Sequence, residues 1–336
     1  LVQMVIDVLC AYLRMPYTPR PEAPSEHSTP PVLPSVSSTT AVDLSPLGGS
    51  DHDDAHHEKH QAAQEEHRER VLDFESFQQV RHTIIRVIGD RLRRPTRWRG
   101  KDYDFTGVVF DGGDLSRAHF TGGLVDFSRS RFIDGRVTFV GAEFIDGKVT
   151  FVGAEFTNGI VDFVGARFTG GRVDFDDAKF TSGKVNFSMA KFTKGTVDFS
   201  EAEFTGGKVD FGVAEFTGGW VNFSGARFTG EEMQFLGARF TGGAVSFSRA
   251  EFTGGWVNFF AARFIEGRVS FFGTRFTDVW VEFSGATFLD GTVDFDEAEF
   301  IGGEVGFRNA TGKRPQGLPS HLWQPAEDEG SESGAS

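Results

Sequence analysis

The 336-residue chain has a single cysteine and no long apolar run, and these shortages set its first limits. With Cys10 alone no intrachain disulfide can form, which suits a reducing compartment such as the cytoplasm. No apolar run reaches the roughly 18 residues that a membrane helix needs. Residues 1–15 lack the basic start and the cleavage site of a secretory signal. We therefore expect a cytoplasmic protein.

The chain also lacks the sets of residues that act together in common active sites. Between residues 103 and 311 the only histidine is His119 and there is no cysteine, so Ser–His and Cys–His nucleophiles lack a partner. Neither GxxxxGK[ST] nor a GxGxxG that enters a helix occurs, which excludes the common phosphate loops. Paired carboxylates such as Asp176-Asp177 have no apolar pocket to shift their pKa. We expect no enzyme activity and no cofactor.

One segment has histidines at a spacing that could suit a metal. The cluster consists of His52, His56, His57, His60 and His67. Its i, i+4 pairs would lie on one face of a helix, as zinc ligands can. The run is rich in glutamate and has no thiolate nearby, so a solvated helix or linker is favoured and no metal site is expected.

What the chain does contain is 38 phenylalanines and 42 glycines, arranged in a repeat. The first repeats are strict pentapeptides: YDFTG, VVFDG, GDLSR and AHFTG. After Gly122 one phenylalanine series runs in steps of twelve from Phe127 to Phe307, and another from Phe132 to Phe300. The phenylalanines outside both series and the first repeats are Phe74, Phe77, Phe260 and Phe272.

The twelve-residue unit allows a two-sided coil of 12 residues or a four-sided coil of 24. Stacked coils bring equivalent outward positions to about 4.8 Å, where like charges should be avoided. The residue before the second phenylalanine alternates in sign at every 24-residue step: Arg131, Glu155, Lys179, Glu203, Arg227, Glu251, Arg275, Glu299. At 12-residue steps like and opposite signs are equally frequent. The charges therefore predict a 24-residue coil.

These residues resemble the pentapeptide-repeat family, whose pattern is [small/apolar]-x-[Leu/Phe]-x-x. The resemblance implies an all-β fold, a right-handed four-sided parallel β-helix with one pentapeptide on each side. The centre residue and the small residue two before it would point inward, and Asp198, Ser200, Glu203 and Thr205 outward. The expected core ladder includes Phe127, Phe132, Phe139, Phe144, Phe199, Phe204 and Phe211.

The rest of the chain divides by composition. Residues 1–15 read as a helix, 16–70 as a disordered Pro/Ser-rich and His-rich linker, and 71–95 as a helix that caps the repeats at 103–311. Residues 312–336 read as a disordered tail, in which Leu318, Leu322 and Trp323 could fold back. The N-terminal helices are similar to the helical module of a bacterial, notably actinobacterial, subgroup. That similarity implies membrane association only through an upstream segment missing from this chain.

The surface offers two functional hypotheses. Outward apolar residues, Leu236, Trp256, Phe260 and Trp280, predict a contact with an unknown protein partner or a second copy, as in a non-enzymatic scaffold. Alternatively, the resemblance includes DNA mimics that bind DNA gyrase, and the net charge of −14 with acidic residues on one side suits them. Those acidic residues are Asp126, Asp174, Asp176, Asp177, Asp198, Glu201, Asp294, Asp296 and Glu297. Direct nucleic-acid binding is not expected.

Overall fold

The computed structural model of the chain describes residues 1–23, 51–229 and 232–325, with only the backbone described for residues 51–60. The chain divides into two compact units, residues 1–15 with 82–336 and residues 16–81. Each unit is described by itself. The larger unit contains the repeats.

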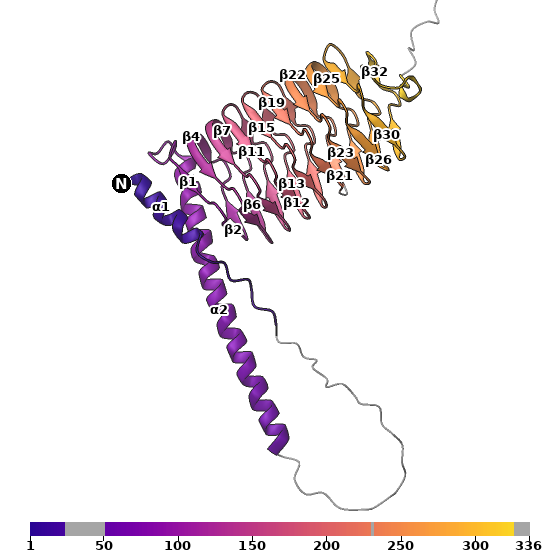
Figure 1. Ribbon diagram of the computed structural model, residues 1–336. Helices are drawn as coiled ribbons and strands as arrows, with labels where there is room; N and C mark the ends of the chain where they lie inside the picture. The colour runs from indigo at the N-terminus through magenta and orange to yellow at the C-terminus, as the bar shows by residue number, and fades with distance from the viewer. Residues whose placement is uncertain (24–50, 230–231, 326–336) are drawn as a thin grey trace, which may run out of the picture. The chain divides into compact units, whose positions relative to one another are not determined.

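In the larger unit, short parallel strands wind into a solenoid with four faces (Figure 1). Faces 1 and 4 belong to one 14-stranded sheet, because four long strands turn the corner between them. Face 1 contains β1 (Tyr103–Asp104), the second halves of β4 (His119–Asp126) and β7 (Glu143–Thr150), β11 (Arg172–Asp174), β15 (Thr196–Asp198), β19 (Trp220–Asn222), the second halves of β22 (Arg239–Ser246) and β25 (Arg263–Ser270), and β29 (Thr292–Asp294). Face 4 contains the first halves of β4, β7, β22 and β25, together with β10 (Arg167–Phe168), β14 (Lys191–Phe192), β18 (Glu215–Phe216), β28 (Thr287–Phe288) and β32 (Thr311–Gly312).

Faces 2 and 3 are separate nine-stranded sheets. Face 2 contains β2 (Val109–Phe110), β5 (Arg131–Phe132), β8 (Glu155–Phe156), β12 (Lys179–Phe180), β16 (Glu203–Phe204), β20 (Arg227–Phe228), β23 (Glu251–Thr253), β26 (Arg275–Thr277) and β30 (Glu299–Ile301). Face 3 contains β3 (Gly113–Asp114), β6 (Arg136–Thr138), β9 (Ile160–Asp162), β13 (Lys184–Asn186), β17 (Lys208–Asp210), β21 (Glu232–Gln234), β24 (Trp256–Asn258), β27 (Trp280–Glu282) and β31 (Glu304–Gly306).

The strand register confirms the 24-residue, four-sided coil. Lys179 pairs with Glu203, and Glu203 pairs with Arg227, so the alternating charges do lie in one ladder. The ladder carries ion pairs between neighbouring coils, such as Arg275 to Glu299 at 3.0 Å. The first coil is two residues shorter than the later ones: Tyr103 pairs with Val125, whereas Gly113 pairs with Val137. The two residues are absent from the corner between β2 and β3, where strict pentapeptides follow each other directly.

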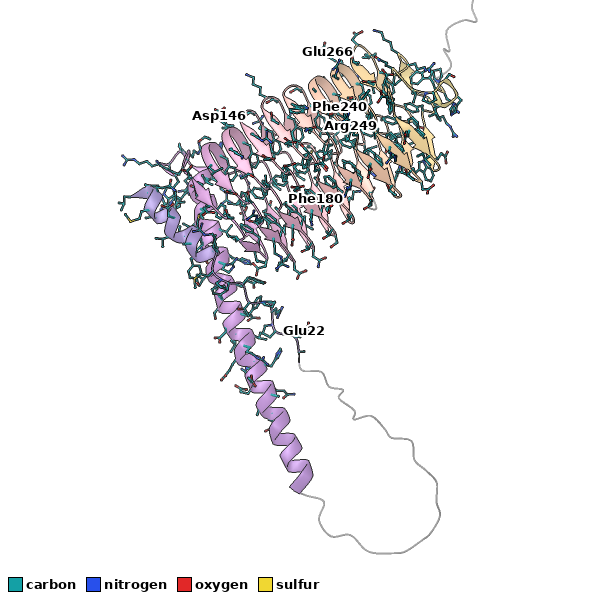
Figure 2. The ribbon with its side chains drawn as sticks, viewed as in Figure 1. Glu22, Asp146, Phe180, Phe240, Arg249 and Glu266 are labelled. Carbon is teal, nitrogen blue, oxygen red and sulfur yellow. The ribbon has the colours of Figure 1, made fainter. Side chains whose placement is uncertain are left out.

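Stacked phenylalanine rings fill the interior. In-register rings of neighbouring coils lie nearly parallel, as for Phe156 and Phe180, whose centroids are 4.5 Å apart at 7°. The phenylalanines of the expected ladder are all buried. The small inward residues are buried with them, as the pattern predicted for Val197 and Ala202. Figure 2 shows Phe180 and Phe240 inside the solenoid. Burying a phenylalanine contributes about 1.5–3 kcal/mol, so the coils need no disulfide.

Glycine is required where the corners of successive coils approach each other. Gly183 has a φ of +82°, and a Cβ on it would lie 2.5 Å from the carbonyl oxygen of Gly159. An L side chain there would meet both the backbone strain and this clash.

The amino-terminal end of the solenoid is covered by α1 (Val2–Leu13) and the last part of α2 (Asp51–Arg93). Ile6, Cys10 and Leu13 of α1 are buried, as are Ile88 and Leu92 of α2. The backbones come close: a Cβ on Gly89 would lie 2.5 Å from the Asp114 carbonyl oxygen. The expected cap is thus made by two helices.

The helix α2 differs from the sequence-based boundaries. It begins at Asp51, so residues 51–70, expected in a linker, are helical. This segment is rich in Glu, Ala, Gln, Lys and Arg and contains no Pro or Gly, which favours a helix despite the charged composition. In the smaller unit, residues after Pro16 pack on α2: the rings of Tyr17 and Phe74 meet edge to face at 6.4 Å.

The tail is folded beyond its expected boundary at 312, and the expected fold-back of Leu318, Leu322 and Trp323 is confirmed. Leu318 is completely buried, a short 3-10 helix spans Ser320–Leu322, and the ring of Trp323 contacts Phe288 and Phe307. Residues 313–325 therefore fold against the last coils, because these apolar side chains cover rings that have no following coil. The remainder of the expected tail, 326–336, and residues 24–50 of the linker lie outside the described residues.

Candidate interaction surface

Exposed apolar side chains border face 3 on both edges. Trp256 and Trp280 start adjacent strands, pair in register, and are 42% and 54% exposed. Leu236 and Phe260 lie at the opposite edge, where face 3 turns into face 4, and are each 47% exposed. The N–H of Gly237 donates to the Phe260 carbonyl at 2.9 Å, which places these two residues in neighbouring coils.

Two residues that the sequence interpretation missed extend this edge. Met189 and Val213 occupy the same corner in the two preceding coils and are 54% and 56% exposed. The N–H of Val213 donates to the Leu236 carbonyl at 2.8 Å. We call Met189, Val213, Leu236 and Phe260 the apolar ridge. The sequence does carry a signal for them: an exposed-type turn position is apolar in four successive coils. The steps between these residues are 24, 23 and 24, because Leu236 and Phe260 stand one residue earlier in their turns than Met189 and Val213.

The backbone of the ridge is strained. Met189 and Val213 have φ angles of +58° and +52°. The same position is glycine in other coils, for example Gly165 and Gly237. A β-branched residue in this region is an outlier, and such conformations cost on the order of 1–3 kcal/mol. The exposed side chains recover little of this cost within the described chain.

Buried amides support the phenylalanine of the ridge. Asn258 Oδ1 accepts the N–H of Phe260 at 2.8 Å, and Asn258 Nδ2 donates to Gln234 Oε1 at 2.9 Å. Both amides are almost completely buried. Because their hydrogen bonds are satisfied inside the corner, the backbone under Phe260 is held in one conformation.

A small hollow, open to solvent, lies beside Trp256 at the corner between faces 2 and 3. Its described lining is mainly apolar, with Phe204, Phe228 and Met233 among its residues. The ionisable side chain in that lining is Glu232, which pairs with Lys208 Nζ at 2.9 Å. The described lining could thus contact an apolar side chain of a partner, and it contains no pair of titratable groups for acid–base chemistry.

Two of the acidic residues expected on one surface are buried inside the corners. Asp174 and Asp198 are 5% and 6% exposed, so the expectation that Asp198 faces outward was wrong. Asp198 Oδ1 accepts the N–H of Ser200, and Arg172 lies between the two carboxylates at 2.9 Å from each. The Asp side chains are buried because they turn back to accept hydrogen bonds from the backbone of the corner, as short polar side chains do in turns. In other coils the position equivalent to Asp174 and Asp198 on face 1 is neutral: Thr150, Asn222, Ser246 and Ser270.

A local negative charge does remain where Asp176 and Asp177 follow this pair. The pKa of Asp176 is raised, first by partial burial and then by repulsion from Asp177, Asp174 and Asp198. Burial raises the pKa of the Cys10 thiol to about 12, which disfavours the nucleophilic thiolate.

Two other searches concern metals and membranes. Within residues 1–23, 61–229 and 232–325, no three His, Cys, Asp or Glu side chains group as metal ligands. The side chains of His52 to His60 lie outside the described part. In that same part of the chain no helix has both the length and the apolarity to cross a membrane.

Comparison with known proteins agrees with the repeat architecture. The family model for pentapeptide repeats, in nine copies, matches residues 105–147. No curated protein sequence matches the chain. A trypsin-treated variant of QnrB1, a plasmid-mediated fluoroquinolone resistance protein, is 17% identical over 64% of this chain and 89% of its own. The TM-score is 0.20, so this likeness carries no inference about function. Residues 105–147 thus match the pentapeptide repeats of this family, and the 24-residue spacing of the coils continues beyond the match to Thr311–Gly312.

Proposed function

We propose that the protein is a non-enzymatic scaffold that binds a protein partner, or a second copy of itself, along face 3. The surface consists of the apolar ridge and the Trp256–Trp280 pair. The tether to the cytoplasmic side of a membrane that the N-terminal helices imply belongs to the same proposal.

The observation that carries this proposal is the strained, exposed Val213. A conformation that costs free energy and leaves an apolar side chain 56% exposed is best accounted for by a contact made with another molecule. Aromatic and methionine side chains are enriched in the centres of protein interfaces, and tryptophan is common among the residues that dominate their energy. The stacked coils beneath hold this surface rigid, which lowers the entropy lost on binding.

The test is the double substitution Trp256→Ala and Phe260→Ala. The association of the chain with itself is measured by light scattering, and its association with captured protein by quantitative pull-down. We expect binding to fall by about tenfold or more, since central aromatic residues each contribute more than 1 kcal/mol. The melting temperature should change no more than in the control variant below, because both pairs of side chains are about half exposed.

The matched control is Trp220→Ala with Leu289→Ala, which removes a tryptophan and a second apolar side chain of similar exposure from other parts of the surface. The control should retain full binding. Unchanged association and an unchanged set of captured proteins in the face 3 variant would rule out this surface.

A second candidate is the DNA mimic that binds DNA gyrase, favoured by the negative cluster around Asp176. The neutral residues and Arg172 in the neighbouring ladder oppose it, because a mimic needs a continuous negative stripe. A supercoiling assay separates the two functions. The mimic predicts inhibition or protection of gyrase over a range of chain concentrations, and no effect over that range would exclude it.

A further inference from the structure

The helix α1 is apolar on two sides, and only one of them is covered by the described chain. Ile6, Cys10 and Leu13 are buried against the end of the solenoid. On the other side Met4 and Val8 are 61% and 64% exposed, and Val5 and Met15 are also exposed. A helix that is apolar all round is normally buried, so the uncovered side calls for an occupant.

A dense basic segment follows α2. Residues 91–101 contain six Lys and Arg and no acidic residue, although the whole chain carries −14. Two of these cations hold the end of α2: Arg99 donates to the carbonyls of Leu92 and Arg93, and Arg93 Nε to that of Ser116. Arg91 lies over the ring of Trp98.

The other three cations have no such structural use. No ion pair or hydrogen bond joins the side chains of Arg94, Arg97 and Lys101 to any residue in the described part of the chain. Three unpaired cations lie within eight residues of the chain, and two of them, Arg97 and Lys101, line one hollow, so this segment favours an anionic ligand.

The apolar side of α1 and the basic segment adjoin each other. A shallow hollow, open to solvent, is lined by Leu1, Val2 and Gln3 of one segment and by Arg97, Arg99 and Lys101 of the other. The Gln3 side chain ties the two segments: Nε2 donates to the Asp102 carbonyl at 2.8 Å, and Oε1 accepts the Asp102 N–H at 3.2 Å. Leu1, Met4, Val5 and Val8 then continue one helical stripe from this hollow.

We propose that this end of the solenoid binds the surface of an anionic lipid bilayer. Met4, Val5 and Val8 enter the boundary between headgroups and acyl chains, and the cations contact the headgroups. A short apolar stripe flanked by Lys and Arg is the composition of interfacial helices. A protein partner is less favoured, because the centres of protein interfaces are depleted in charged residues overall, although arginine and methionine are enriched there.

This inference goes beyond the scaffold function and differs from a membrane tether upstream, because the described residues themselves make the contact. The acidic remainder of the chain is repelled by the same lipids, which restricts binding to this end of the solenoid.

The test is flotation of the full 336-residue chain with phosphatidylcholine vesicles, with and without phosphatidylserine. We expect binding to the anionic vesicles only. Raising the salt concentration should weaken it, since the attraction falls off over a Debye length of about 8–10 Å. Equal binding to both vesicles, or binding to neither, would overturn the proposal.

The cations are tested by the triple variant R94Q/R97Q/K101Q. Each cation near an anionic surface contributes about 1 kcal/mol, so the partition coefficient should fall roughly a hundredfold. The control K148Q/K194Q/R268Q removes the same charge from exposed positions on the repeats and should leave binding unchanged. Equal loss in both variants would show only a general effect of net charge and would overturn the site.

The apolar stripe is tested by Met4→Ser with Val8→Ser, which should also release the chain from anionic vesicles without lowering its melting temperature. If these changes instead abolish a dimer seen by light scattering and leave vesicle binding intact, a second copy covers the stripe and the proposal fails. The face 3 variant should still float, so a failed scaffold function and a failed membrane site give different results.

Discussion

Val213 stands out among the residues whose backbone adopts a positive φ. In the described part of the chain eleven non-glycine residues do so, and ten of them occupy the same turn position as Val213. Eight of the eleven are Arg, Asp, Glu or Asn. Polar residues tolerate this region best when they are Asn or Asp, and valine tolerates it poorly because of its branched Cβ. Val213 and Met189 are the two large apolar members, and both lie on the apolar ridge.

The strain predicts opposite effects of one substitution on stability and binding. Val213→Asn keeps a side chain but suits the left-handed region. We expect the free energy of unfolding to rise by about 1 kcal/mol, measured by urea titration, because the strain is relieved. Partner or self association should weaken at the same time, because the ridge loses an apolar member.

The equivalent change at a position without a branched side chain serves as the control. Ala261 has a similar φ of +55° but no branched side chain, so Ala261→Asn should change stability less. A loss of stability in Val213→Asn would contradict the strain argument.

The sequence predicted the length of the coil but not the residues of the apolar ridge. Opposite charges such as Lys179 and Glu203 identified the coil length, because stacking brings equal positions together and like charges repel. The sequence pattern does not reveal φ, so Met189 and Val213 read as ordinary variable positions. Asp198 was misplaced for a related reason: in a straight strand it would alternate outward, but the chain turns at that residue and its carboxylate caps the turn.

At the scale of the elements, the end of α2 and the first coil are held together by an ion pair and by close backbone packing. Arg93 Nη2 lies 2.8 Å from Asp114 Oδ2, and Gly89 allows the two backbones to approach closely. The sequence predicted a capping helix from the spacing of Ile84, Ile85, Ile88 and Leu92. It did not predict where α2 begins, because a charged helix and a charged linker have similar compositions, and helices in water gain much of their stability from packing.

The junction between α2 and the first coil should be sensitive to acid. The pKa of Asp114 lies below its ordinary value of 3.8: burial opposes this shift, but hydrogen bonds from Ser116 and the Arg93 guanidinium outweigh it. A lowered pKa in the folded state stabilises the protein above pH 3.8, and this contribution disappears as the pH falls below that value.

Asp114→Asn should therefore lower the free energy of unfolding at pH 7 by less than about 1 kcal/mol, since the carboxylate is half exposed and screened. At pH 3 the difference between the variant and the unchanged protein should shrink. Urea titrations at both values measure it. The exposed Asp134→Asn serves as control, and a difference that grows on acidification would contradict the assignment.

The larger unit as a whole behaves as a one-dimensional stack, because each coil contacts only its neighbours and the end segments. Rings at an end of the stack have one neighbouring ring instead of two. At the carboxyl-terminal end, Trp323 supplies the missing contact, with its ring 5.7 Å from Phe288 and 6.1 Å from Phe307. The sequence indicated this segment only through isolated apolar residues in a polar tail.

The stack predicts that damage at this end stays local. Trp323→Ala should expose Phe288 and Phe307, and amide hydrogen exchange should accelerate in residues 287–312 while residues 119–216 keep their protection. The control Trp220→Ala removes an exposed tryptophan from the middle of the stack and should change neither region. Uniform loss of protection along all coils would instead mean that the coils unfold as one cooperative unit, because the effect of a lost cap would then reach every coil equally.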